Sequence, residues 1–303
     1  MIILDGKKIA NDVKTIVLDG KKIANDIKKE LSVRVNDLKN KGINPCLGII
    51  LVGKRKDSET YVNMKRKSCL EIGIKNKDIY LEENVTEEEI IKEVNKMNLD
   101  PEVHGILIQL PLPKHINEEK VINSVVLKKD VDGFHQENIG KLALNRKDNF
   151  IRPCTPEGCI ELLDRYNVEI EGKNVVVVGK SNVVGLPMSL MFLHREATVM
   201  VCHTKTKNLK KITSQGDILV VACGCKEFIT SEYVKENAVV IDVGINPVKD
   251  DTKKNGYRVT GDVNFKFVEE KCSYITPVPG GVGPMTIAML LKHTVDLSSQ
   301  NEK

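Results

Sequence analysis

Short apolar runs rich in Val, Ile and Leu recur along this chain and alternate with segments of helical pattern. They read CLGIILVG, VHGILIQLPLP, NVVVVG, DILVVACG and AVVIDVG, at residues 46–53, 103–113, 174–179, 217–224 and 238–244. Continuous apolar runs of this length are typical of strands that are buried on both faces of a parallel sheet. Because parallel strands need crossover connections, usually helices, the alternation predicts an α/β fold.

The length of the chain allows two domains. Its 303 residues, 41% of them hydrophobic and 29% charged, are enough for two cores of ordinary size. The strand–helix rhythm occurs twice, and we place the boundary near residues 146–156. We expect a first domain over residues 1–150, completed by a C-terminal helix over residues 281–303, and a Rossmann-like second domain over residues 151–280. The expected fold class is α/β, with two doubly wound domains and a cleft between them.

The N-terminal segment contains a repeat. LDGKKIAND occurs at residues 4–12 and again at residues 18–26, and nothing later repeats it. A solenoid needs three or more units, so we interpret the repeat as a local duplication. The second copy leads directly into a helix-patterned segment that closes at Gly42, and we therefore expect residues 1–14 to be surplus to the fold.

Several classes of protein are disfavoured by the sequence. No stretch approaches the ~20 apolar residues of a membrane span, and the N-terminus lacks the apolar core of a signal peptide. We therefore expect a cytoplasmic protein that binds no membrane. The eight cysteines form no Cys-x-x-Cys pair and no zinc spacing, which predicts reduced thiols and no metal site. No basic stretch is interleaved with aromatic residues, so nucleic acid is not an expected partner.

The segment VVVVGKSNVVGLPMS has the pattern of a strand, a turn and a helix. Gly179 permits a sharp turn, and backbone N–H groups at the helix N-terminus can face a pyrophosphate. The spacing departs from G-x-G-x-x-G, because Ser181 replaces the second glycine and Gly185 follows one residue late. A dinucleotide loop and a simple strand-to-helix turn both fit this segment.

The end of the next strand favours one dinucleotide over the other. An NAD site has an Asp or Glu there for the ribose hydroxyls, whereas this chain has His203, Thr204 and Lys205. Hydroxyl and cationic groups, together with Lys180, suit the additional phosphate of NADP. NADP is therefore the expected cofactor, although polar residues after a strand also occur in any loop.

Three segments of the first domain contain candidate site residues. Tyr61 and Lys65 are four apart in a helical pattern and share a face, although most such lysines are surface residues. Gln109 lies in an apolar run, where a buried amide normally has a specific partner. KDVDGFH places Asp130 and Asp132 around a turn.

Eight segments, in order, resemble those of the bifunctional methylenetetrahydrofolate dehydrogenase/cyclohydrolases. They are YVNMKRKSCLEIG, GILIQLPLP, KDVDGFH, RPCTPEG, VVVVGKSNVVGLPMS, TVMVCHTKT, VVIDVGIN and YITPVPGGVGPMT. The resemblance covers nearly the whole chain from about Leu18 to His293. It implies an enzyme of one-carbon metabolism that serves purine biosynthesis. Such an enzyme oxidises 5,10-methylenetetrahydrofolate with NADP and hydrolyses the methenyl product to 10-formyltetrahydrofolate.

The same resemblance implies roles for individual residues. Lys65 is the implied catalytic residue, with Gln109 positioning its amine, Tyr61 orienting the folate and Asp132 hydrogen-bonding the pterin. The implied loop beside the folate contains Gly281, Gly283 and Pro284. The implied NADP contacts are Gly179, Lys180, Ser181, Gly185, His203, Thr204, Gly224 and Ile245.

Two positions depart from the family pattern. Lys180 stands where members usually have Arg, which keeps the charge but loses the bidentate fork, so a weaker preference for NADP is expected. The segment ACGC at residues 222–225 lacks the common Gly-x-Pro. This departure concerns the contact of that segment with the dinucleotide and not the fold.

Partners follow from the resemblance and from charge. The resemblance implies a homodimer that acts on tetrahydrofolate derivatives. Residues 1–75 hold 17 Lys and Arg against 9 Asp and Glu, which predicts either a solvated basic surface or, near Lys54, Arg55 and Lys56, attraction for a polyglutamate tail. Two alternative functions remain: a monofunctional dehydrogenase, and a non-catalytic folate- or NADP-binding protein.

Overall fold

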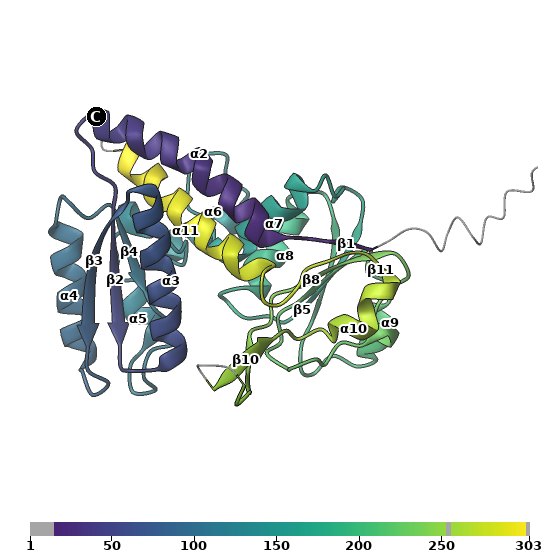
Figure 1. Ribbon diagram of the computed structural model, residues 1–303. Coiled ribbons are helices and arrows are strands. Elements are labelled where there is room, and N and C mark those ends of the chain that lie inside the picture. The colour runs from purple at the N-terminus through teal and green to yellow at the C-terminus, as the bar shows by residue number, and fades with distance from the viewer. Residues whose placement is uncertain (1–14, 253–255, 301–303) are drawn as a thin grey trace, which may run out of the picture. The chain divides into compact units, whose positions relative to one another are not determined.

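The computed structural model describes residues 15–252 and 256–300, which form two compact units (Figure 1). Residues 24–157 and 286–300 form the small-sheet unit, and residues 15–23 and 158–285 form the large-sheet unit. The first LDGKKIAND copy, expected to be surplus, lies outside the described residues. The domain limits expected from the sequence stay a prediction.

The small-sheet unit contains a three-stranded parallel sheet in the order β3-β2-β4. Its strands are β2 (Cys46–Val52), β3 (Lys75–Leu81) and β4 (Gly105–Ile108). Every residue of β2 is buried, as its apolar run predicts for a central strand covered on both faces. The remaining elements of this unit are α3 (Lys56–Ile72), α4 (Glu87–Leu99), α5 (Glu118–Ile122), η1 (Leu127–Lys129) and α6 (Gln136–Ala143).

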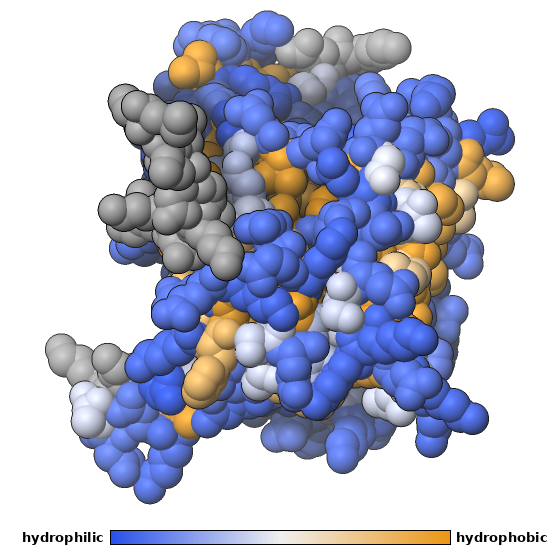
Figure 2. All heavy atoms as spheres, turned by 90° about the vertical axis from the view of Figure 1, so that its right-hand side faces the viewer, coloured by the Kyte–Doolittle hydropathy of each residue, from blue (hydrophilic) through white to orange (hydrophobic). Residues whose placement is uncertain are grey.

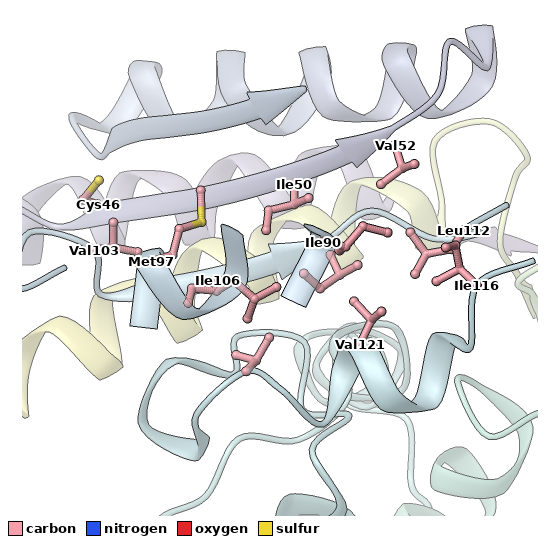
Figure 3. Close-up of a cluster of buried hydrophobic side chains, with 13 residues drawn as sticks. Cys46, Ile50, Val52, Ile90, Met97, Val103, Ile106, Leu112, Ile116 and Val121 are labelled. Carbon is pink, nitrogen blue, oxygen red and sulfur yellow. The ribbon is translucent and has the colours of Figure 1, made fainter. Parts of the chain in front are cut away.

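The core on one face of this sheet is built from side chains at alternate strand positions. Figure 3 shows Ile50 and Ile106 from neighbouring strands packed against Ile90 and Met97 of α4 and Val121 of α5. The period-2 alternation of a strand explains why these residues share a face. The capping box predicted at the start of α4 is confirmed, since the side chain and backbone of Thr86 and Glu89 bond reciprocally.

The strand expected over VHGILIQLPLP, residues 103–113, is longer than the observed β4. β4 ends at Ile108, and Gln109 still donates its backbone N–H to Ile50 O at 2.9 Å. Beyond it, Pro111 and Pro113 have no N–H to donate to a ladder. The chain therefore leaves the sheet directly after Gln109, which places this amide at the carboxyl end of the strand.

Three helices have residues in both units. Asp19 begins the first of them, because its Oδ1 accepts the N–H of Lys22 at 2.9 Å. In the small-sheet unit, Arg34 and Asp296 form an ion pair between the first and the last of these helices. The three helices are α2 (Gly20–Asn40), α7 (Cys154–Arg165) and α11 (Val282–Ser299).

The large-sheet unit contains six parallel strands in the order β1-β11-β8-β7-β5-β6. They are β1 (Ile16–Val17), β5 (Asn174–Val178), β6 (Thr198–Cys202), β7 (Ile218–Val221), β8 (Ala238–Asp242) and β11 (Cys272–Ile275). Strand β6 lies on one side of β5 and β7 on the other, so the direction of winding reverses there. This is the doubly wound arrangement predicted from the apolar runs.

Shorter elements complete this unit, among them an antiparallel pair that the sequence did not predict. The helices are α8 (Gly185–Leu193), α9 (Leu209–Thr213), α10 (Phe265–Val268), η2 (Ser231–Tyr233) and η3 (Glu269–Lys271), and the antiparallel pair is β9 (Asn246–Lys249) with β10 (Tyr257–Thr260). Helix α8 begins two residues before Pro187, after which the sequence placed it.

The surface is predominantly polar in the view of Figure 2, where hydrophilic residues cover most of the face and hydrophobic residues show between them. Within the described residues, no helix has both the length and the apolar character needed to cross a membrane. All eight cysteines are free thiols.

Candidate functional site

Four parallel strands of the large-sheet unit end at one edge of the sheet. The loops after β5, β6, β7 and β8 therefore lie at that edge, and the winding reverses between β5 and β7. In doubly wound folds, ligands bind at the carboxyl edge beside such a reversal. These loops and the first residue of α8 contain all the residues named above for the dinucleotide: Gly179, Lys180, Ser181, Gly185, His203, Thr204, Gly224 and Ile245.

Two glycines allow the loop after β5 to pass close to its neighbours. Gly179 has φ +129°, and a Cβ there would lie 2.2 Å from Ala222 O. A Cβ at Gly185 would lie 2.1 Å from Gly179 O. The late glycine of the motif is thus required where α8 begins against the turn.

Side chains of this edge divide into those that shape the loop and those that are exposed. The Ser181 hydroxyl accepts the N–H of Val184 at 3.2 Å and of Gly185 at 3.4 Å, which closes the turn. Lys180 and Thr204 are exposed. A cation and a hydroxyl at the tips of adjacent loops suit an anionic phosphate.

The loop after β7 is held by a carboxylate that the sequence did not single out. Asp262, fully buried, accepts the N–H groups of Cys223 at 2.7 Å and Gly224 at 2.8 Å through Oδ2. Its Oδ1 accepts from Asn246 Nδ2 at 2.8 Å. This loop therefore has a fixed backbone without the Gly-x-Pro pattern, and its anchor lies 38 residues beyond Gly224 in the sequence.

In the small-sheet unit, Lys65 and Gln109 are in contact. Helix α3 presents Tyr61 and Lys65 one turn apart, and Lys65 Nζ donates to Gln109 Oε1 at 3.0 Å. The amide orientation is set by the other end of Gln109, whose Nε2 donates to Leu110 O at 2.7 Å. The specific partner expected for this buried amide is therefore a half-buried lysine amine.

The two aspartates of KDVDGFH have different environments. Asp130 accepts the N–H groups of Gly133 and His135 and the Nδ2 of Asn138, so it holds the turn. Burial raises the pKa of Asp132 to about 6, against the opposing effect of Lys65. Asp132 is thus a carboxylate that can change protonation near neutral pH.

The pKa of Lys65 is shifted in the opposite direction, downward. Burial lowers the pKa of the Lys65 amine, and the charge of Asp132 opposes this effect. An amine with a lowered pKa beside a carboxyl with a raised pKa is suited to proton transfer near neutral pH. The structure brings Lys65, Gln109 and Asp132 into one cluster, with Tyr61 one helical turn before the lysine.

The glycine-rich segment before α11 lies in the large-sheet unit. Gly281 N donates to Pro277 O at 2.8 Å, and Gly283 and Pro284 form the first turn of the helix. A Cβ at Gly283 would meet nothing within 4 Å. The assignment of Gly281, Gly283 and Pro284 to a folate site stays a prediction.

A cavity of about 690 Å³ opens at the carboxyl end of the small sheet. Its wall includes Pro111 and Leu112, which follow Gln109 in the chain, and the cationic side chains of Arg55 and Lys114. Within residues 15–252 and 256–300, no group of three His, Cys, Asp or Glu side chains could hold a metal ion.

Comparison with known proteins identifies both parts of the chain. Residues 18–132 match the catalytic domain of tetrahydrofolate dehydrogenase/cyclohydrolase, and residues 153–302 match its NAD(P)-binding domain. The chain is 51% identical to bifunctional protein FolD 2 of Arabidopsis thaliana over 295 residues, which cover 97% of this chain and 94% of that protein.

Solved structures agree with this assignment. The bifunctional FolD of Campylobacter jejuni superposes with a TM-score of 0.90 at 48% identity, covering 95% of this chain and 99% of that one. The FolD of Trypanosoma brucei, solved with NADP and an inhibitor, superposes with a TM-score of 0.92 at 41% identity, covering 95% and 98%. The chain therefore belongs to the tetrahydrofolate dehydrogenase/cyclohydrolase family.

Proposed function

We propose that this protein is a bifunctional enzyme that oxidises 5,10-methylenetetrahydrofolate with NADP and hydrolyses the resulting methenyl cation to 10-formyltetrahydrofolate. The observation that carries the proposal is the hydrogen bond from Lys65 Nζ to Gln109 Oε1 in a cluster with Asp132. The proposal is supported by relatives about 50% identical that are named bifunctional FolD.

In the oxidation, the chain's own work is to align two ligands. Bound NADP supplies the hydride acceptor. The glycines at Gly179 and Gly185 let backbone N–H groups approach the pyrophosphate, and Lys180 and Thr204 bind the ribose phosphate. The NADP in the Trypanosoma brucei relative supports this assignment.

In the hydrolysis, water adds to the methenyl carbon and protons must move. The Lys65 amine takes a proton from the attacking water, and the resulting ammonium returns a proton to N5 as the bond between N5 and the carbon breaks. The hydroxyl proton of the adduct leaves to solvent as the formyl group forms on N10. Gln109 Oε1 accepts a hydrogen bond from the Lys65 amine at 3.0 Å and so positions it. Burial lowers the pKa of the Lys65 amine, so the amine can act as a base.

The remaining assignments concern substrate binding. Tyr61 orients the folate ring, and the Asp132 carboxylate accepts from the pterin N–H groups. Gly281, Gly283 and Pro284 border the folate. Two cations at the cavity of the small-sheet unit, Arg55 and Lys114, outnumber the one carboxylate among its lining residues, Glu83, and so favour a substrate with an acidic polyglutamate tail.

The biological setting also belongs to the proposal. The protein acts in the cytoplasm as a homodimer, and its product provides one-carbon units for purine biosynthesis. The absence of a candidate membrane-spanning helix among residues 15–252 and 256–300 is compatible with that compartment.

The test follows reduced nicotinamide, methenyl and formyl folate together, in wild type, Lys65→Met and the matched control Lys67→Met. Lys67 lies on the same helix and is exposed. We expect wild type and Lys67→Met to make all three products, and Lys65→Met to lose about 10²-fold or more of the hydrolysis.

Other outcomes identify the two alternatives. Accumulation of methenyl folate by wild type, without hydrolysis above the uncatalysed rate, would indicate a monofunctional dehydrogenase. Binding of folate and NADP without turnover would indicate a binding protein. Equal hydrolysis by Lys65→Met and wild type would remove Lys65 from the mechanism.

A further inference from the structure

A fully buried histidine lies beside the proposed active-site cluster. His293, on α11, places Nδ1 at 2.8 Å from Val131 O and Nε2 at 2.7 Å from Glu157 Oε2. A backbone carbonyl oxygen only accepts hydrogen bonds, and so does an ionised carboxylate. Both ring nitrogens must therefore donate, which makes this side chain an imidazolium.

The partner carboxylate stabilises that charge. Burial opposes ionisation of Glu157, but His293 and Lys292 lower its pKa to about 2. Burial and the neighbouring Lys292 charge oppose the charge on His293, yet the pairing with Glu157 outweighs both and raises the pKa of His293. Lys292 Nζ lies 2.9 Å from the other carboxylate oxygen. The positive charge on His293 is thus held in place by hydrogen bonds and by an ionised partner.

This cation adjoins the backbone that carries Asp132. Val131, whose carbonyl His293 binds, directly precedes Asp132. Cys154 Sγ lies 3.3 Å from Val131 O and 3.4 Å from His293 Nδ1, so its thiol packs beside the contact between the ring and this turn. The imidazolium, the thiol and the turn form one buried cluster.

Groups from three helices and one turn change the pKa of the Asp132 carboxyl. Lys65 from α3 and His293 from α11 lower its pKa, and the Cys154 thiol of α7 lowers it further through a hydrogen bond. Asp130, in the same turn, raises it, and burial raises it most. Together these effects leave the pKa of Asp132 at about 6. The loss of one nearby cation therefore changes the protonation of Asp132 at pH values near neutral.

We propose that His293 is a positioning residue whose buried positive charge keeps the Asp132 carboxylate ionised and whose Nδ1–H fixes the backbone on which Asp132 is mounted. It acts through Asp132 and touches no substrate. The inference rests on the proposed function, in which the Asp132 carboxylate accepts hydrogen bonds from the pterin. A protonated Asp132 would present a donor to those N–H groups and bind the substrate less well.

The experiment measures kcat/KM for methenyl hydrolysis from about pH 5 to about pH 8, in wild type and in His293→Gln, which removes the charge but keeps an amide that can donate. We expect the acid limb of the profile to move up by roughly one pH unit, the order of effect of one nearby opposite charge. Glu157→Gln removes the partner that holds the charge and should move the limb in the same direction.

Lys292→Gln is the matched control. It removes one positive charge from the adjacent position of α11, and Lys292 is not among the groups that act on Asp132. We expect its acid limb to coincide with that of wild type. Protonation of the Lys65 base also lowers hydrolysis on the acid side, so Asp132→Asn, measured in parallel, should keep only the Lys65 part of the limb, and His293→Gln made in the Asp132→Asn background should then shift it no further.

The outcomes separate the inference from the proposed function. An unshifted acid limb in folded His293→Gln, or a uniform loss of activity at every pH, would overturn the role of His293. If His293→Gln does not fold, judged by its thermal melting, the Glu157→Gln profile decides by the same criterion. Absence of hydrolysis by wild type itself would overturn the proposed function instead.

Discussion

Replacing Gly179 by alanine tests whether the loop after β5 binds the cofactor. Two costs apply at this position. The backbone has φ +129°, a region that L residues rarely adopt, and such strain costs about 1–3 kcal/mol. In addition, the new Cβ would lie 2.2 Å from Ala222 O, so the loops after β5 and β7 would have to separate. We expect a local rearrangement that costs roughly 2–4 kcal/mol to reverse when NADP binds.

That cost corresponds to a roughly 30- to 1,000-fold loss of NADP affinity, because each 1.4 kcal/mol is about tenfold. The matched control is Gly172→Ala, at the amino end of β5. Gly172 also has a positive φ, +71°, but a Cβ there would meet nothing within 4 Å. Gly172→Ala therefore places an L residue at a positive φ without a clash, and we expect its NADP affinity to stay within about threefold of wild type.

The assay is calorimetric titration of NADP, accompanied by thermal melting and by hydrolysis of methenyl folate. The proposed function assigns hydrolysis to Lys65 and Gln109 of the small-sheet unit, so we expect Gly179→Ala to retain it. Wild-type affinity for NADP in Gly179→Ala would refute the assignment of this loop. Equal losses of affinity in Gly179→Ala and Gly172→Ala would refute the steric argument.

Two further predictions concern buried carboxylates. Asp262→Asn must place its NH₂ group against either two backbone N–H donors or the Nδ2 of Asn246. We therefore expect urea unfolding to show a free energy of unfolding about 1–3 kcal/mol lower than that of wild type, together with weaker NADP binding. An unchanged stability and an unchanged NADP affinity would contradict the anchoring role. Glu157, with its pKa lowered from 4.5 to about 2, contributes stability that is present above about pH 4.5 and lost as the pH falls toward 2. Between about pH 4.5 and pH 2, the free energy of unfolding of Glu157→Gln should therefore fall by roughly 3 kcal/mol less than that of wild type. Parallel curves of the free energy of unfolding against pH for the two proteins would contradict this.

Local patterns predicted the elements that depend on local physics. The central strands β2, β5, β7 and β8 follow from their apolar runs, and the start of α4 follows from the Thr86–Glu89 capping box. The position of Gln109 in an apolar run indicated a buried amide with a specific partner, and that partner is Lys65. For the strands and the cap, the signal and its cause lie within a few residues of one another, whereas the partner of Gln109 lies 44 residues away.

The groups that the sequence did not reveal act over long separations. Asp262 reaches the Cys223–Gly224 backbone from 38 and 39 residues away, and His293 meets Glu157 from 136 residues away. A buried Asp or His has no periodic signature, because its partner is determined by tertiary packing. β1 was missed for a similar reason, since two residues form a strand only when a distant edge, here β11, accepts them.

The order in which segments of the two units alternate along the chain has a consequence for how the protein is made. The large sheet takes its edge strand from Ile16–Val17, while the small-sheet unit takes its last helix from residues 286–300. A ribosome that has released residues 24–157 has therefore not yet supplied His293, the cation that neutralises Glu157. Domains commonly fold in order during synthesis, but here the earlier unit must await the synthesis of residues 286–300 to bury that carboxylate in its final form. The first-made unit is thus completed by residues that are synthesised after the whole of the large-sheet unit.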